Sequence, residues 1–173
     1  MSTALLGDPA SMSAFGASLR RHAVQLAADG ERLATGLDDA SPGWRGPRAT
    51  GTRRRATTVA VQTRAIAVSL DDVGRTLQSA ATDLAAAIAH LRELEDAAAA
   101  LGLDVREGAV TKGWGITGVA DPAAVHDEDR RRRRLQERVH QAVTTLGRRR
   151  ARLAEELTRA AEILAASSAE LRG

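Results

Sequence analysis

The side chains of this sequence that are best suited to acid–base or metal chemistry are those of four histidines, since histidine titrates nearest to neutral pH. They are His22, His90, His126 and His140. None belongs to an H-E-x-x-H motif or stands with acidic residues at metal-ligand spacing. The chain has no cysteine, and it contains neither a Gly-x-Ser-x-Gly motif nor a phosphate-binding glycine loop. We therefore expect a protein that is not an enzyme and that has no metal site and no cofactor.

Three arginine clusters are the second group that could act chemically, by neutralising phosphates. They are Arg53–Arg55, Arg130–Arg134, and Arg148–Arg150 with Arg152. Acidic residues at 127–129 precede the second cluster at the helical spacing that favours ion pairs, and no aromatic residue lies near a cluster to stack on a base. The net charge is only +3. These features argue against a nucleic-acid partner.

The segment from Trp44 to Arg64 differs from the other basic regions because it contains bases and no acid. It carries Arg53, Arg54 and Arg55, which form the best candidate for a basic patch. The patch stands next to a turn-rich stretch, Ser41-Pro42-Gly43-Trp44-Arg45-Gly46-Pro47.

The elements that position these residues are predicted to be helices. The 173 residues are 43% hydrophobic and 2% aromatic, with abundant alanine, leucine and arginine and few strand formers. The sequence therefore predicts an all-α protein. Apolar runs are far shorter than the roughly 20 residues of a membrane span. Residues 1–25 have no basic region before an apolar stretch, so we expect no membrane span and no conventional signal peptide.

The first helix is predicted at about 9–37, after the capping pair Asp8-Pro9. Two rows with a seven-residue repeat run along it. One row is mostly leucine (Met12, Leu19, Leu26, Leu33), and the other is mostly small (Gly16, Ala23, Gly30, Leu37). A small row beside a leucine row allows close approach of a neighbouring helix.

Two longer helices follow, at about 52–101 and 122–173, joined by a glycine-containing loop at 102–121. Gly102 is expected to end the helix at about 52–101. Asp121-Pro122, before the helix at 122–173, repeats the start signal of the first helix. Apolar residues recur at a spacing of three and four through both, as in coiled coils. The fold class is thus an elongated antiparallel bundle of three main helices, two of them long. The third helix is expected to pack back on the hairpin formed by residues 1–101.

A simple antiparallel register about the 102–121 loop predicts which residues of the long helices face each other. It places Arg148–Arg150 and Arg152 beside Asp71 and Asp72, and it places Arg130–Arg134 opposite Glu93, Glu95 and Asp96. Six leucine and isoleucine residues are the expected packing or partner interface: Leu19, Leu26, Ile66, Leu70, Leu77 and Leu84. Trp114, in the glycine-rich loop, either caps the end of the bundle or serves as an anchor for a partner.

Trp44-Arg45-Gly46 is the most specific motif of the chain, because a W-x-G turn here joins two amphipathic helices. A tryptophan at this place can cover the hairpin mouth, while glycine permits a backbone conformation that other residues avoid. Over about residues 8–101 the chain resembles the WXG100-type proteins of type VII (ESX-like) secretion systems. The resemblance implies an antiparallel helical hairpin whose turn holds Trp44 and Gly46, and which pairs into a four-helix bundle.

The same resemblance implies a function in type VII secretion, as a secreted substrate, a partner or a targeting subunit. The partners that it implies are a second copy, another WXG-type helical protein and the secretion machinery. The chain would be secreted or held at the cell surface by a route independent of a signal peptide, or cytoplasmic before export. The arginine and alanine bias is typical of a GC-rich genome, which suits an actinobacterium.

Two features depart from the family pattern. The family's export signal places a tyrosine four residues before an acidic residue, and this chain contains no tyrosine. It also has an additional long helix. Both departures fit a larger relative whose partner supplies the signal, and they fit equally a cytoplasmic coiled-coil scaffold or adaptor. A nucleic-acid-binding protein rich in arginine is the third alternative.

Overall fold

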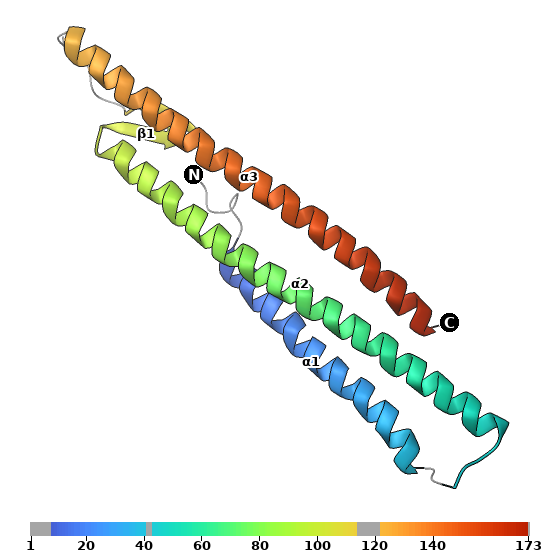
Figure 1. The fold of residues 1–173 in the computed structure, drawn as a ribbon. Coiled ribbons are helices and arrows are strands. Elements are labelled where there is room, and N and C mark those ends of the chain that lie inside the picture. The colour runs from blue at the N-terminus through green and yellow to red at the C-terminus, as the bar shows by residue number, and fades with distance from the viewer. Residues whose placement is uncertain (1–7, 41–42, 114–121, 173) are drawn as a thin grey trace. The chain divides into compact units, whose positions relative to one another are not determined.

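Three helices and one small hairpin of strands make up the part of the chain that the structure describes (Figure 1). The computed structural model describes residues 8–40, 43–113 and 122–172. In chain order the elements are α1 (Pro9–Ala40), α2 (Pro47–Ala99), β1 (Leu103–Arg106), β2 (Ala109–Lys112) and α3 (Pro122–Arg172). The prediction of an all-α protein with three main helices is therefore confirmed, with a two-stranded sheet as an addition.

The chain divides into two compact units, which we describe separately. Among the described residues, the hairpin unit contains 8–9 and 81–153, that is, the first residue of α1 with the one before it, the end of α2, both strands and the first part of α3. The three-helix unit contains residues 10–80 and 154–172, that is, α1 after its first residue, most of α2 and the end of α3.

The helix limits follow local signals. Both α1 and α3 begin at the prolines predicted for them, Pro9 and Pro122. In contrast, α2 begins at Pro47 and not near 52, because the Gly46 carbonyl already accepts the first helical hydrogen bond, from the Thr50 amide (3.1 Å). The prediction treated this proline- and glycine-rich stretch as turn because it overlooked proline at the first helical position. α1 extends to Ala40, three residues past the predicted 37.

Residues 103–112, predicted as part of a loop, form an antiparallel β-hairpin. Arg106 pairs with Ala109, so that only Glu107 and Gly108 remain in the turn. Both turn residues have positive φ (53° and 81°), as a type I′ turn requires. The local signal was the alternation of apolar and polar residues on either side of a glycine, and the helical composition of the rest of the chain says nothing about these ten residues.

Gly102 and Gly113 close the base of the β-hairpin. α2 ends at Ala99, two residues before the predicted 101, and Gly102 follows with a φ of 69°, in agreement with its predicted role as terminator. The Gly113 amide donates to the Gly102 carbonyl (2.9 Å). A Cβ at Gly113 would lie 2.7 Å from that carbonyl oxygen, so this contact needs a glycine.

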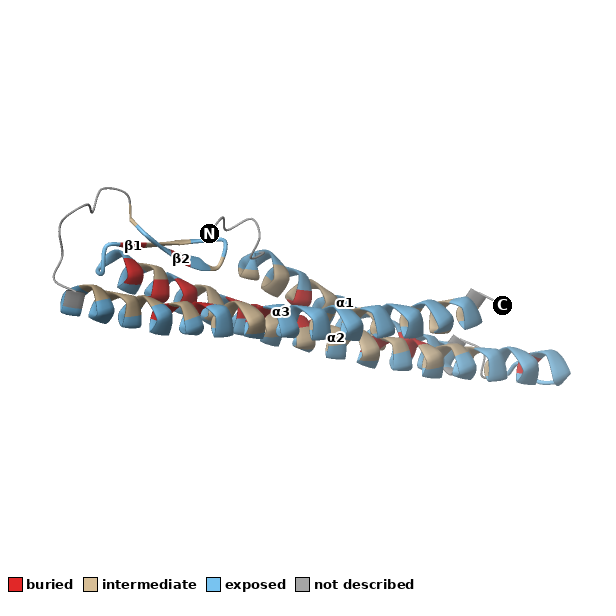
Figure 2. Cartoon of the chain, turned by 90° about the horizontal axis from the view of Figure 1, so that it is seen from above, coloured by how far each residue is buried: buried red, intermediate tan, exposed pale blue. Residues whose placement is uncertain are grey.

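The core of the hairpin unit lies where the strands pack on the two helices (Figure 2). Its buried members come from every element of the unit: Leu94, Ala98, Leu103, Val110, Leu135 and Val139. Gln136 of α3 fastens the strands by two hydrogen bonds. Its side-chain oxygen accepts from the Val110 amide (2.6 Å), and its side-chain nitrogen donates to the Gly108 carbonyl (2.8 Å).

The register of α2 and α3 in this unit differs from the predicted one. Arg149 lies against Asp83 (3.9 Å), whereas the simple register placed Arg148–Arg150 beside Asp71 and Asp72. The reason is that the first turns of α3 pack on the strands, as the ion pair between Lys112 and Glu128 (3.2 Å) shows. Two members of the five-arginine cluster pair along their own helix, Arg130 with Asp127 and Arg132 with Asp129.

Candidate helix-association surface

The turn between α1 and α2 is built around Gly46. Its φ of 108° is strained for any residue with a side chain, although a Cβ there would meet no atom within 4 Å. The Gly46 carbonyl accepts from both the amide and the hydroxyl of Thr50 (3.1 and 3.2 Å). The backbone conformation, and not a shortage of space, therefore explains the glycine of the W-x-G motif.

Trp44 is held in this turn through its backbone. The Arg53 guanidinium donates to the Trp44 carbonyl (3.1 Å), which ties the turn to the second turn of α2. Trp44 itself remains 40% exposed. A tryptophan this exposed covers the hairpin mouth only in part and leaves apolar surface that another molecule can contact.

Two glycines bring α1 and α2 into backbone contact. A Cβ built on Gly16 would lie 2.7 Å from the Gly74 carbonyl oxygen. In the same way, a Cβ built on Gly74 would lie 2.7 Å from the Gly16 carbonyl oxygen. Further along this line of contact between α1 and α2, which we call the seam, Gly30 packs against Thr63. A Cβ built on Gly30 would lie 3.2 Å from the Thr63 Cγ2. The small row of α1 thus faces α2, as its composition indicates.

An ion-pair network marks one flank of this seam. The Arg20 guanidinium donates to Asp71 (2.9 Å) and to Gln78 (3.1 Å), and Arg75 also reaches Asp71 (3.0 Å). The hydrogen bond from Arg20, followed by the charges of Arg20 and Arg75, lowers the pKa of Asp71 below its ordinary value of 3.8 despite opposing desolvation. Arg64 and Glu31 form a second bridge between the helices (2.8 Å).

Two leucine rows lie on the opposite flank, the row of α1 defined above and a row on α2 that contains Ile66, Leu70 and Leu77. On α1, Arg20 and Leu19 stand on opposite sides of the small row, and on α2, Asp71 and Leu70 stand on opposite sides of the row that contains Gly74. Because Arg20 meets Asp71 on one flank, the leucine rows of both helices must meet on the other. The seam therefore separates a charged flank from an apolar one.

The predicted interface residues are covered to different degrees. Leu77 and Leu84 are buried, at 5% and 7% exposure. Leu19, Leu26, Ile66 and Leu70 are only half-buried. At the ends of the leucine row of α1, Phe15 and Leu33 are exposed (59% and 42%). The apolar flank of the three-helix unit is thus incompletely covered.

The end of α3 adds to this incomplete packing. Its apolar stripe includes Leu157, Leu164 and Leu171, all half-buried. Between residues 154 and 171, no side chain that the structure describes is fully buried. A helix that buries none of its stripe completely leaves room for further packing.

The basic patch is partly engaged in the turn. Arg54 and Arg55 are exposed, whereas Arg53 is half-buried and bound to the Trp44 carbonyl. The four histidines do not gather into a site, and within residues 8–40, 43–113 and 122–172 no group of His, Asp or Glu could hold a metal ion. Trp114, the possible loop anchor, lies outside the described residues.

Sequence reasoning overlooked two parts of this surface. Gly74 stands inside a long leucine-rich helix, where glycine is unfavourable, and this is the signal that could have predicted a close helix contact. The pairing of Arg20 with Asp71 could not be found in this way, because it depends on the register of the two helices.

Comparison with known proteins adds no relative. No family model, no curated protein and no solved structure matches this chain. In the described part of the chain, no helix is long and apolar enough to cross a membrane.

Proposed function

We propose that the protein acts by helix–helix association, as a WXG100-like component of a type VII secretion system. It would serve as a secreted substrate, a partner or a targeting subunit, and it would perform no catalysis. The observation that supports this proposal most strongly is the apolar flank of the α1–α2 hairpin. Most residues of its two leucine rows are only half-buried, and Phe15 and Leu33 beside them are exposed.

The W-x-G turn supports the same proposal. Gly46 has a backbone conformation that suits glycine, and the turn joins two antiparallel helices whose backbones touch at Gly16 and Gly74. Pairing of this hairpin with a second chain in a coiled-coil-like bundle would cover the apolar flank. A second copy or another helical protein would supply the missing helices.

Substitutions on the two flanks test the association. Phe15→Glu with Leu33→Glu places charge on the apolar flank at exposed positions, so the fold should survive. Val24→Glu is the matched control, because Val24 is 70% exposed and lies beside Arg20 and Asp71 on the charged flank. The assay is molar mass by light scattering, for the chain alone and with the products of neighbouring genes.

We expect the wild type and Val24→Glu to form a complex and the double variant to lose it. Equal complex formation by all three proteins would contradict the proposed surface. Export is tested separately, by comparing the culture medium of the source organism with and without an active type VII ATPase. If the chain is absent from the medium of both strains and binds no secreted partner, the secretion proposal is wrong and an adaptor function takes its place.

A further inference from the structure

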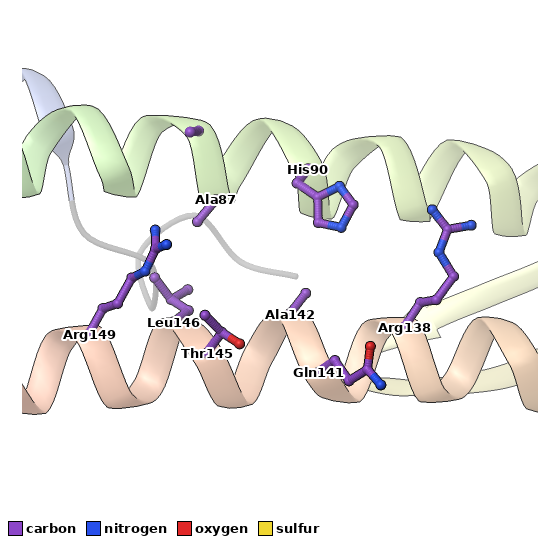
Figure 3. Close-up of a pocket in the computed structure, with 9 residues that line it drawn as sticks. Ala87, His90, Arg138, Gln141, Ala142, Thr145, Leu146 and Arg149 are labelled. Atoms are coloured by element: carbon purple, nitrogen blue, oxygen red, sulfur yellow. The ribbon is translucent and has the colours of Figure 1, made fainter.

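The hairpin unit carries an open groove between α2 and α3, on the flank away from the strands. Its volume is about 400 Å³. Figure 3 shows His90 projecting from α2, and Arg138 and Arg149 projecting from α3 toward α2. On α3, the groove residues at 138, 141, 145 and 149 form one stripe, whereas the strand contacts at 136, 139 and 143 form another.

The floor of the groove is made of small side chains. Ala86 and Ala87 of α2 and Ala142 of α3 line it, together with Leu146. Alanine side chains allow another helix to approach closely and to pack its own side chains between them. The strands already cover the other flank of the same helix pair, and the groove lining that the structure describes comes from α2 and α3 alone.

The rim of the groove is basic. Arg149 has a loose ion pair with Asp83 (3.9 Å), and His90 contacts Glu93 (3.3 Å). Among the described residues, Arg138 has no acidic partner. Arg134, Arg148 and Arg152 continue the same stripe of α3 at helical spacing and are all exposed. The groove therefore presents an apolar floor with excess positive charge along one edge.

We propose that this groove docks an acidic amphipathic helix of a partner protein. Small apolar residues of that helix would pack on the alanine floor, and its carboxylates would meet Arg138 and Arg149. These arginines are about 16 Å apart by helix rise, which matches acidic residues spread over three turns of the docked helix. This site is separate from the apolar flank of the three-helix unit.

An acidic helix suits the groove better than a nucleic acid. Phosphate contacts need charge but no apolar floor, and stacking on bases needs aromatic side chains. The groove lining contains alanines and no phenylalanine, tryptophan or tyrosine, so that His90 is its one ring. Charge complementarity above a narrow apolar seat is the arrangement expected for an amphipathic helix.

The test uses a fluorescent helical peptide of about 18 residues, with alanine and leucine on one face and glutamate at helical spacing on the other. A peptide with glutamine in place of glutamate is the control ligand. Binding is followed by anisotropy, at about 50 mM and 200 mM salt. We expect the glutamate peptide to bind the full chain more tightly than the glutamine peptide, and less tightly at the higher salt concentration.

Variants locate the site. Arg138→Gln with Arg149→Gln should weaken binding of the glutamate peptide about tenfold, the scale of losing close charge pairs. Arg92→Gln is the matched control, because Arg92 is an exposed arginine of the same unit that does not line the groove. Ala86→Trp fills the floor at an exposed position and should abolish binding without removing any charge.

Equal binding of the glutamate and glutamine peptides would overturn the proposal. So would an Arg92→Gln variant that weakens binding as much as the double variant. A single-stranded DNA that binds more tightly than the peptide, with no effect of Ala86→Trp, would identify a phosphate polymer instead. The Phe15→Glu and Leu33→Glu variant should retain peptide binding, which separates this site from the proposed association surface.

Discussion

Gly16 of α1 and Gly74 of α2 face each other so closely that a methyl group on either would lie 2.7 Å from the other's carbonyl oxygen. This contact sets the spacing of the two helices in the three-helix unit. It also brings Arg20, one turn after Gly16, within reach of Asp71. The close approach therefore positions both the charged flank and the apolar flank.

Gly74→Ala should destabilise the protein by about 1–3 kcal/mol, because the added methyl group forces the helices apart. Gly51→Ala is the matched control, since Gly51 also lies in α2 and a Cβ there meets no atom within 4 Å. That control should stabilise by about 0.5–1 kcal/mol through helix propensity. Urea unfolding measures both. A Gly74→Ala variant as stable as Gly51→Ala would disprove the close contact.

Gly46→Ala should destabilise the turn by about 1–2 kcal/mol, because its φ of 108° is unfavourable for an L-residue. Gly43→Ala provides the comparison, since a Cβ at Gly43 also enters open space and its φ is not positive. Thermal unfolding followed by circular dichroism measures the difference. If both variants melt at the same temperature, the backbone conformation of Gly46 does not explain the motif.

The stability of the chain should decrease in acid through Asp71. The pKa of Asp71 is lower in the folded state than the value of 3.8 expected for the unfolded chain. The ionised carboxylate therefore stabilises the fold at pH values above 3.8, and this stabilisation is lost as the pH falls through the folded-state pKa. Asp71→Asn should be less stable than the wild type at neutral pH, and the difference should vanish in acid. Asp72→Asn, which loses only an exposed pair with Arg75, should show a smaller change. Urea titrations at several pH values measure these differences, and a difference that persists at low pH would contradict the role of Asp71.

Gln136→Leu should destabilise the hairpin unit by about 1–3 kcal/mol, because it leaves the Val110 amide and the Gly108 carbonyl without their partner. Gln141→Leu is the control, since Gln141 is exposed on the same helix. Hydrogen exchange of the Val110 amide provides a local measurement. Unchanged protection of that amide in Gln136→Leu would show that the hydrogen bond does not hold the strands.

The sequence by itself determined the features that depend on neighbouring residues. Asp8-Pro9 and Asp121-Pro122 predicted where α1 and α3 begin, and Gly102 predicted the end of α2 to within a few residues. The small row of α1 predicted a close helix contact. These signals are local, since capping, proline geometry and helical periodicity act within one or two turns.

Only the tertiary structure decided which residues meet. The register of α2 and α3 shifts because the β-hairpin packs on the first turns of α3, so that Arg149 lies against Asp83. The same packing leaves one flank of that helix pair open and lined by Arg138 and His90. Helical periodicity repeats every turn and is satisfied equally by several registers, so contacts between distant segments must select one of them.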